Sequence, residues 1–401
     1  MVTLAIGHSY ARNRACSRIG NDARSCFEAI RYTNSLIRIP VKTASRSYEV
    51  LVSRRLLREV CKPVDQATPH CTQVCVVTSK PIRKRWGKTL EKGLRGLSGK
   101  VQFFEMPDGE RAKRLVNLEK LAEKVAESGA DRHSIVIALG GGVVGDVGGF
   151  LASVFMRGIP VIQVPTTLVA QVDSAIGGKT GVNLKIGKNL VGTFHQPTCV
   201  LVDPDVLSTL PEREYRSGLF EAMKYGVIRN PRIFELMEKH RDALLARDGD
   251  LLQELITDCI RVKAEVVSSD ERESGERRIL NYGHTIGHAL ETETGYKSLL
   301  HGEAVGWGMI AAASIAWETG VSDPETAQRI RELVIGYGPL PEFKVKPGRI
   351  FKRLMSDKKT IGGTPHFVLA RRVGEVDIVN DVPKRAILKA VEELNQLACR
   401  K

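Results

Sequence analysis

A glycine-rich turn between a buried strand and a helix constrains the fold of this chain more than any other feature. Ile135–Leu139 is an unbroken apolar run, and Gly140-Gly141-Gly142-Val143-Val144-Gly145 follows it directly before a helical pattern. This arrangement fits G-x-G-x-x-G in the strand, turn and helix setting that binds dinucleotides. Glycine is needed there because a Cβ atom would keep the backbone away from a pyrophosphate.

The turn departs from the ordinary dinucleotide fingerprint in one respect. The next apolar run, Val161–Pro165, leads to Thr166-Thr167 rather than to an acidic residue. Taken alone, the turn is therefore as compatible with simple packing of a helix on a sheet as with phosphate binding.

Strands and helices alternate in the first half of the chain. From Leu36 onward, β-branched runs and helical periodicity follow one another, which is typical of a mainly parallel sheet covered by helices. We predict an amphipathic helix at Leu115–Glu127 and strands at Tyr48–Val52, Val74–Thr78, Val101–Met106, Ile135–Leu139 and Val161–Val164.

After about Pro211 the pattern changes to helices with few β-branched runs between them. The predicted helices are Glu212–Gly226, Pro231–Leu245, Leu251–Val267, Ile279–Thr292 and Glu303–Glu318. We therefore place a boundary near Asp205–Pro211, with an α/β domain over residues 36–211 and an α-helical domain over residues 212–401.

Residues 1–35 carry five arginines against two acidic residues and show no clear apolar periodicity. We exclude them from the predicted fold. A disordered leader, or a wrongly assigned start of the chain, is favoured over an organelle-targeting peptide, although such peptides are also rich in Arg and Ser.

The formal net charge of +14 would suit nucleic acid, an anionic membrane or an anionic small substrate. The basic residues are scattered, however, and only 5% of the residues are aromatic, so bases would have few surfaces to stack on. Ile135–Met156 contains six glycines and Asp146, which argues against a membrane span. The eight cysteines form no Cys-x-x-Cys pair, so we expect reduced thiols in a cytoplasmic enzyme.

His284 and His288 lie four residues apart and share one face of a predicted helix. The spacing is that of the zinc peptidases with His-Glu-x-x-His. Position 285 is Thr, so the general-base glutamate of that motif is missing and peptidase chemistry is disfavoured. A histidine pair on one helix more often packs in the core, or supports a metal ligand, than binds a metal itself.

Glu221 and His301 are further candidates for a metal site. Glu221 shares a helix face with Lys224 and Tyr225, for which a salt-bridged surface helix is the alternative. His301 begins a helix of small and apolar residues, where it could simply be a cap. A carboxylate and two imidazoles can hold a divalent metal and leave one coordination position open. Spacing alone leaves the choice of ligands open.

Taken together, these stretches closely resemble the 3-dehydroquinate synthase family of the sugar-phosphate cyclases, from about Tyr48 to Arg372. The resemblance rests on long blocks in one order. The blocks are Leu-Gly-Gly-Gly-Val-Val-Gly-Asp from 139, Gln-Val-Pro-Thr-Thr-Leu from 163, Asp-Ser-Ala-Ile-Gly-Gly-Lys-Thr-Gly from 173, Gly-Lys-Asn at 187, Phe-His-Gln-Pro at 194, Glu-Ala-Met-Lys-Tyr-Gly at 221, Asn-Tyr-Gly-His-Thr-Ile-Gly-His at 281, His-Gly-Glu-Ala-Val at 301 and Asp-Lys-Lys at 357.

The resemblance implies a Rossmann-like NAD domain followed by an α-helical metal domain. It implies conversion of 3-deoxy-D-arabino-heptulosonate 7-phosphate (DAHP) to 3-dehydroquinate and phosphate, a lyase step of the shikimate pathway. The implied metal, Zn2+ or Co2+, is held by Glu221, His284 and His301, whereas His288 is a substrate or proton-relay residue. In that reaction NAD+ transiently oxidises a hydroxyl, phosphate is eliminated, the hydride is returned, and an aldol step closes the ring.

Such a substrate carries a carboxylate and a phosphate, so the resemblance also implies several cations. Arg157 would reach across the interface of a homodimer, while Asp173 and Glu273 would orient cations or substrate hydroxyls. The implied substrate contacts are Arg157, Lys179, Lys188, Lys224, Lys263, Arg277 and Lys358, with Asn189 and Asn281 as neutral donors.

The implied NAD contacts extend over the first half of the chain. They are Glu110, Lys113, Gly141, Gly142, Val143, Asp146, Thr166, Thr167, Lys179, Lys188 and Thr209. The chain departs from the family at Thr78-Ser79-Lys80, where an acidic residue often contacts the adenosine ribose. Ser79 can still form a hydrogen bond but carries no charge.

Three other functions compete with this prediction. The first is another cyclase of the group, an inosose, valiolone or amino-dehydroquinate synthase; Arg277, Asn281, His288 and Lys358 favour dehydroquinate synthase. The second is a metal-dependent polyol dehydrogenase, which would not need so many substrate cations. The third is a nucleic-acid binder, which only the net charge suggests.

Overall fold

The computed structural model describes residues 36–356 and 365–399, and these belong to one compact unit. The leader predicted for residues 1–35 lies outside the described residues. The sequence predicts reduced thiols, and the described residues include six free cysteines, four of them buried. No helix in the described ranges is long and apolar enough to cross a membrane.

A seven-stranded sheet forms the first half of the unit, in the order β1-β2-β9-β6-β5-β3-β4. The strands from β2 to β4 in this order pair in parallel, and β1 pairs antiparallel with β2. Their bounds are β1 Ile37–Lys42, β2 Ser47–Val52, β3 Gln73–Ser79, β4 Lys100–Met106, β5 Ile135–Gly140, β6 Val161–Pro165 and β9 Cys199–Val202. All the predicted strands are confirmed.

Both faces of the sheet are covered by helices, which explains why its central strands are apolar throughout. Alternate residues of β3 belong to opposite cores: Val74 and Val76 to one, Cys75 and Val77 to the other. The covering helices are α1 Cys61–Ala67, α2 Lys80–Ile82, α3 Lys88–Gly93, α4 Leu115–Glu127 and α5 Gly142–Val154. The apolar stretch Ile135–Met156 is thus a buried strand, a glycine turn and a helix, as predicted.

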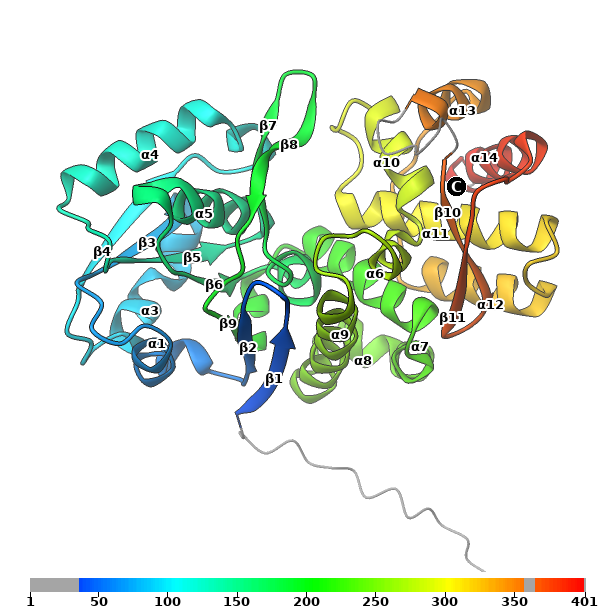
Figure 1. Cartoon of the computed structure of the whole chain (residues 1–401). Coiled ribbons are helices and arrows are strands. Elements are labelled where there is room, and N and C mark those ends of the chain that lie inside the picture. Colours follow the sequence, from blue (N-terminus) through cyan, green and yellow to red (C-terminus); the bar gives the residue numbers. More distant parts are fainter. Residues whose placement is uncertain (1–35, 357–364, 400–401) are drawn as a thin grey trace, which may run out of the picture. The chain divides into compact units, whose positions relative to one another are not determined.

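A hairpin that the sequence patterns did not predict follows β6. It consists of β7 Lys179–Leu184 and β8 Gly187–Phe194, paired antiparallel, and Figure 1 shows it projecting from the sheet. The side chains of β8 are mostly exposed, so the strand has no apolar alternation to reveal it.

The second half is helical, as predicted, but also contains a small two-stranded sheet. Its elements are α6 Glu212–Ile228, α7 Pro231–Lys239, α8 Arg241–Leu245, α9 Gly249–Ser269, α10 His284–Glu293, α11 His301–Glu318, α12 Pro324–Gly336, α13 Pro347–Ser356, β10 Phe367–Arg372, β11 Glu375–Val379 and α14 Lys384–Ala398. The first apolar core continues from β1, β2 and β9 into these helices, and α9 meets β1 where Lys42 N donates to Ser268 Oγ at 3.0 Å.

Two predicted helices have different bounds in the structure. The helix predicted at Pro231–Leu245 is divided at His240 into α7 and α8. The helix predicted at Ile279–Thr292 begins only at His284, because residues Glu276–Asn281 form a 3-10 turn and Gly283, with a left-handed φ of 76°, separates that turn from α10. The boundary between two domains near Asp205–Pro211 remains a prediction.

Candidate active site

Three helices bring the candidate metal ligands together. Glu221 lies in the middle of α6, His284 begins α10 and His301 begins α11. Glu221 Oε1 lies 3.3 Å from His301 Nε2 and 3.6 Å from His284 Nε2, and the glutamate is fully buried. Residues that are far apart in the sequence thus present one carboxylate oxygen and two imidazole nitrogens to one point.

Glycines allow these helices to approach one another closely. A Cβ on Gly302 would lie 2.6 Å from the carbonyl carbon of Ser217 on α6, and a Cβ on Gly287 would lie 2.8 Å from the carbonyl oxygen of Ala304 on α11. Real Cβ atoms essentially never come within 3.0 Å of such atoms. Gly302, directly after His301, and Gly287, three residues after His284, are therefore needed for the close approach of the helices that carry the ligands.

Polar contacts at Nδ1, a hydrogen bond for His284 and an ion pair for His301, orient both imidazoles so that Nε2 faces Glu221. His284 Nδ1 lies 3.0 Å from the carbonyl oxygen of Tyr282, and His301 Nδ1 lies 3.5 Å from Glu291 Oε2. Burial holds the pKa of His284 well below its usual value. Burial opposes protonation of His301 too, but the Glu291 and Glu221 carboxylates raise its pKa overall. An acceptor at Nδ1 is the usual support for a metal-binding histidine.

The residues at this point fit a divalent metal. Glu221 Oε1 is buried and has no hydrogen-bond partner within the described part of the chain, although such an orphan is costly. A metal ion between it and the two Nε2 atoms would satisfy it. The His288 ring lies 5.3 Å from that of His284 and 5.7 Å from that of His301, centroid to centroid, so it too borders the site. The choice of Glu221, His284 and His301 as the ligands remains a prediction.

A buried group of charges adjoins the metal position. Lys224 Nζ donates to Glu221 Oε2 at 2.7 Å and lies 4.0 Å from Asp173 Oδ1, which accepts from Lys263 Nζ at 2.5 Å and from Tyr225 OH at 2.7 Å. Burial lowers the pKa of Lys263 to about 8, with the Asp173 carboxylate opposing the shift. Burial opposes ionisation of Asp173, but the two ammonium groups hold its pKa well below the usual value.

A second group of predicted substrate residues gathers on the loop after α9. Glu273, at a left-handed φ of 61°, forms an ion pair with Lys179 and accepts from Asn281 Nδ2 at 2.8 Å. Asp270 orders this loop by accepting hydrogen bonds from the backbone of Ser274, Gly275 and Arg277.

Arg277 lies on the same loop and is only 1% exposed. It donates to the carbonyl oxygens of Glu271 and Gly177, and its Nε atom has no partner among the described residues. A Cβ on Gly177, which has a φ of 99°, would lie 2.5 Å from the Arg277 Nη2 atom, so the glycine makes room for the guanidinium.

The candidate phosphate site lies where β5 leads into α5. Gly141 precedes the helix without any side-chain cap, so the first N–H groups of α5 are available to an anion. Packing also requires these glycines: a Cβ on Gly141 would lie 2.9 Å from Thr167 Cγ2, and one on Gly142 would lie 3.0 Å from Ser174 Oγ. The same turn can therefore pack α5 on the sheet and bind a phosphate.

Other predicted NAD residues lie around this turn. Lys113 is buried and contacts both Asp146 and Asn189, while Asn183 Nδ2 donates to Glu110 Oε1 at 2.7 Å. At the ends of the strands beside β5, the hydroxyls of Ser79 on β3 and of Thr166, directly after β6, are buried and unpaired within the described ranges. Of these features, the uncapped N–H groups after Gly141 fit the phosphates of a dinucleotide. The fully buried Ser79 does not present its hydroxyl to solvent, where a ribose would arrive.

Two predicted site residues are not brought to the others, and a third lies outside the described residues. Arg157 lies on an exposed turn after α5, at a left-handed φ of 70°, and forms no ion pair within the described ranges. Thr209 is exposed and accepts from Trp86 Nε1 at 3.1 Å. Lys358 lies outside the described residues.

Sequence reasoning missed Glu291, Asn183 and Asp270. Glu291 is 4% exposed, and its Oε1 accepts from Lys188 Nζ at 3.2 Å. Burial alone would raise the pKa of the Glu291 carboxyl, but His301 and Lys188 outweigh burial and lower this pKa to about 2. None of the three belongs to a recognisable motif. The signal that could have found Glu291 is its helical spacing, seven residues after His284.

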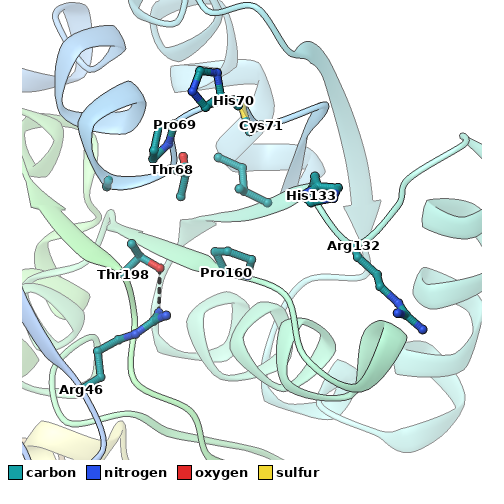
Figure 2. A pocket seen from close by; sticks show the side chains of 11 residues that line it. Arg46, Thr68, Pro69, His70, Cys71, Arg132, His133, Pro160 and Thr198 are labelled. Carbon is teal, nitrogen blue, oxygen red and sulfur yellow. Dashed lines mark hydrogen bonds between the residues drawn. The ribbon is translucent and has the colours of Figure 1, made fainter.

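A cavity of about 240 Å³ lies elsewhere, at the amino ends of the strands (Figure 2). Arg132 and His133 precede β5, Pro160 precedes β6 and Thr198 precedes β9, whereas the glycine turn follows β5. Arg46 donates to Thr198 Oγ1 at 2.9 Å inside it. The cavity is therefore separate from the candidate active site.

Comparison with known proteins identifies the family that this architecture resembles. Residues 103–217 match the family described as 3-dehydroquinate synthase N-terminal, and residues 218–360 match 3-dehydroquinate synthase C-terminal. A 3-dehydroquinate synthase of Koribacter versatilis is 56% identical over 361 residues, which is 90% of this chain and 99% of that protein. One from Solibacter usitatus is 48% identical over 352 residues, 88% of this chain and 97% of that protein.

Solved structures give the same picture. The chain is similar to 2-epi-5-epi-valiolone synthase from Streptomyces hygroscopicus with NAD+ and Zn2+ bound, at a TM-score of 0.80 and 28% identity over 88% of this chain and 98% of that one. A 2-deoxy-scyllo-inosose synthase with NAD+ and Co2+ has a TM-score of 0.78 at 28% identity, over 89% and 99%. Glycerol dehydrogenase from Schizosaccharomyces pombe, at 15% identity and a TM-score of 0.65 over 91% and 92%, shares the fold alone.

Proposed function

The chain belongs to the 3-dehydroquinate synthase family, and from this premise we propose how its residues divide the work of the reaction. The reaction converts DAHP to 3-dehydroquinate and phosphate, a lyase step of the shikimate pathway that leads to chorismate and the aromatic amino acids. NAD and one divalent metal, Zn2+ or Co2+, are the cofactors.

One observation carries the assignment of roles: a buried, orphaned carboxylate oxygen of Glu221 between two imidazoles, beside a lysine-rich group of charges. Glu221, His284 and His301 hold the metal. When bound, the metal supplies a Lewis acid and NAD+ a hydride acceptor, which suits a reversible oxidation of a substrate hydroxyl. The orphaned oxygen and the Nδ1 contacts of the two histidines prepare the site for the ion.

The cations bind the anionic substrate. One contact between unit charges at 4 Å contributes about 4 kcal/mol at an effective dielectric of 20, before the cost of desolvation. A few such contacts suffice to hold a carboxylate and a phosphate. The proposed contacts are Lys179, Lys188, Lys224, Lys263 and Arg277, with Asn189 and Asn281; Lys358, outside the described residues, and Arg157, from a second copy of the chain, complete the set.

His288 moves a proton rather than holding the metal. It lies one helical turn after His284, and its ring stacks near that of His301 at 5.7 Å. A histidine is suited to proton transfer because its ordinary pKa lies near neutrality. Asp173 and Glu273 keep the lysines and Asn281 oriented through the hydrogen bonds described above.

On the nucleotide side, we propose that the first turn of α5 binds the pyrophosphate of NAD. The uncapped N–H groups after Gly141 support this role. The other proposed NAD contacts are Glu110, Lys113, Val143, Asp146, Thr166, Thr167, Lys179, Lys188 and Thr209.

The substrate is proposed to be DAHP rather than that of another cyclase. The relatives named 3-dehydroquinate synthase reach 56% identity, whereas the solved valiolone and inosose synthases reach 28%. We further propose a homodimer in the cytoplasm, whose partner is the small anionic substrate rather than nucleic acid or membrane. The exposed position of Arg157 supports a role in a second subunit.

Phosphate release from DAHP tests the function directly. With NAD+ in catalytic amount, phosphate should rise over many turnovers while absorbance of NADH stays flat, because the hydride is returned within each turnover. Lys179→Ala should slow phosphate release without changing the metal content. Accumulation of NADH in proportion to product, or fast oxidation of simple polyols without phosphate release, would overturn the proposal in favour of a dehydrogenase.

A further inference from the structure

Glu291 is a buried carboxylate that contacts two functional groups of the proposed site at once. It lies on α10, seven residues after His284, and only 4% of it is exposed. Its two oxygens are divided between different partners. Oε1 accepts from Lys188 Nζ at 3.2 Å, and Oε2 lies 3.5 Å from His301 Nδ1.

The contact with His301 determines which ring nitrogen faces Glu221. A carboxylate at Nδ1 favours the proton there and leaves the Nε2 lone pair for a metal. That Nε2 atom lies 3.3 Å from Glu221 Oε1. His284 is oriented in the same way by the carbonyl oxygen of Tyr282 at 3.0 Å. The acceptor of His284 is backbone and survives any substitution, whereas that of His301 is a single side chain.

The contact with Lys188 fixes a cation of the β7–β8 hairpin. The Lys188 side chain is 31% exposed, and its ammonium group lies between Glu291 Oε1 and the ring of Tyr296, at 4.1 Å from the ring centroid. A lysine on an exposed hairpin would otherwise sample many rotamers. Glu291 and Tyr296 thus place the ammonium group near the metal position before an anion arrives.

We propose that Glu291 is a positioning residue that orients the His301 imidazole for metal binding and holds Lys188 beside it. One carboxylate then links metal affinity to the placement of a substrate cation. This inference rests on the metal site proposed above, and it assigns Glu291 no contact with substrate or metal.

Metal affinity of the metal-free protein tests the first half of the proposal, by competition for Zn2+ with a chromophoric chelator. Glu291→Gln keeps the shape but has one acceptor oxygen for two donors, so we expect roughly 10- to 100-fold weaker binding. Glu291→Asp keeps the charge and should recover part of the loss. Glu293→Gln is the matched control, because Glu293 lies on the same helix, is 7% exposed and pairs with Arg349 and Arg353 instead.

The NMR signal of Lys188 tests the second half. After reductive 13C-methylation, which retains the charge, the Lys188 methyl signal should be shifted by the Tyr296 ring in the wild type and in Glu293→Gln. In Glu291→Gln it should move toward the position of freely rotating lysines. Lys188→Met identifies the signal and should leave Zn2+ affinity within about twofold, because the contact of Glu291 with His301 remains.

Three results would overturn the inference. Zn2+ affinity of Glu291→Gln within twofold of wild type would show that His301 needs no such support. Equal losses in Glu291→Gln and Glu293→Gln would indicate general weakening of α10. An unchanged Lys188 signal in Glu291→Gln would remove the link to the hairpin. A wild-type protein that binds no metal would instead sink the proposed metal site itself, and this inference with it.

Discussion

The close packing of α6 against α11 leads to a sharp prediction for Gly302→Ala. Gly302 is the second residue of α11, directly after His301. The new Cβ would overlap the carbonyl oxygen of Ser217 and would lie 2.6 Å from the carbonyl carbon, which is about 0.8 Å short of the 3.4 Å at which ordinary contact begins. The atoms that it meets are backbone of α6 and cannot rotate away, so the two helices must separate.

Separation of the helices carries a free-energy cost and moves His301 away from Glu221. Overpacking of this kind costs about 1–3 kcal/mol of unfolding free energy. A metal site tolerates ligand displacements of only about 0.2 Å, less than the shift required here. Each 1.4 kcal/mol of strain that appears in the metal-bound state weakens metal binding about tenfold. We therefore expect lower stability of the metal-free protein together with roughly 10- to 100-fold weaker Zn2+ binding.

Urea unfolding of the metal-free protein and Zn2+ competition measure the two effects separately. Gly348→Ala is the matched control, because Gly348 is also the second residue of its helix, α13, and a Cβ there meets no heavy atom of the described residues within 4 Å. It should be neutral or slightly stabilising. If Gly302→Ala behaves like Gly348→Ala in both assays, close packing does not set the distance between Glu221 and His301, and the reasoning fails.

Three other predictions concern charged and titratable residues of the site. Asp173→Asn should lower the free energy of unfolding by about 3–5 kcal/mol, because it leaves the ammonium group of Lys263 buried without a counter-charge and leaves Lys224 with Glu221 alone; a loss below about 1 kcal/mol in urea unfolding would contradict this. Burial lowers the pKa of Lys263 to about 8; the Asp173 carboxylate opposes this shift, and the charges of Arg277 and Lys224 add to it. The charge of Lys263 is therefore lost as pH rises through that value, and KM for DAHP should increase. Lys263→Arg should remove this pH dependence of KM, and an identical profile in the variant would exclude Lys263 as its source. His288→Ala should retain the metal, measured by elemental analysis, and lose most activity; complete loss of metal would make His288 a ligand.

Much of the fold could be predicted from sequence because its strands and helices bury apolar faces. The run Ile135–Leu139 belongs to a strand covered on both sides, and an unbroken apolar run is what such burial requires. The hairpin β7–β8 escaped prediction because β8 is exposed and is held by pairing with β7 rather than by burial. The start of α10 was misplaced because it depends on the backbone conformation of Gly283, which periodicity does not reveal.

The candidate site was accessible to sequence reasoning only in part. His284 and His288 share a helix face, and that spacing is visible in the sequence. The proximity of Glu221 and His301 depends on the packing of α6, α10 and α11, so spacing left the ligands open, and the family resemblance supplied the set. Glu291 was missed because its partner Lys188 is 103 residues away and its burial arises only when the hairpin and helices meet.

The arrangement of carboxylates explains how several lysine and arginine side chains can lie close together in one site. Glu221 divides its oxygens between Lys224 and the imidazoles, and Glu291 divides its own between Lys188 and His301. Among the described residues, four carboxylates thus face five cationic side chains, an excess of one: Glu221, Asp173, Glu273 and Glu291 against Lys179, Lys188, Lys224, Lys263 and Arg277. A divalent metal would add two positive charges to this excess, and the proposed contacts Lys358 and Arg157 would add one each, toward the carboxylate and the phosphate of one DAHP molecule, which carry roughly three negative charges. The metal is therefore part of the charge that the substrate needs, and the net charge of +14 lies mainly outside the site.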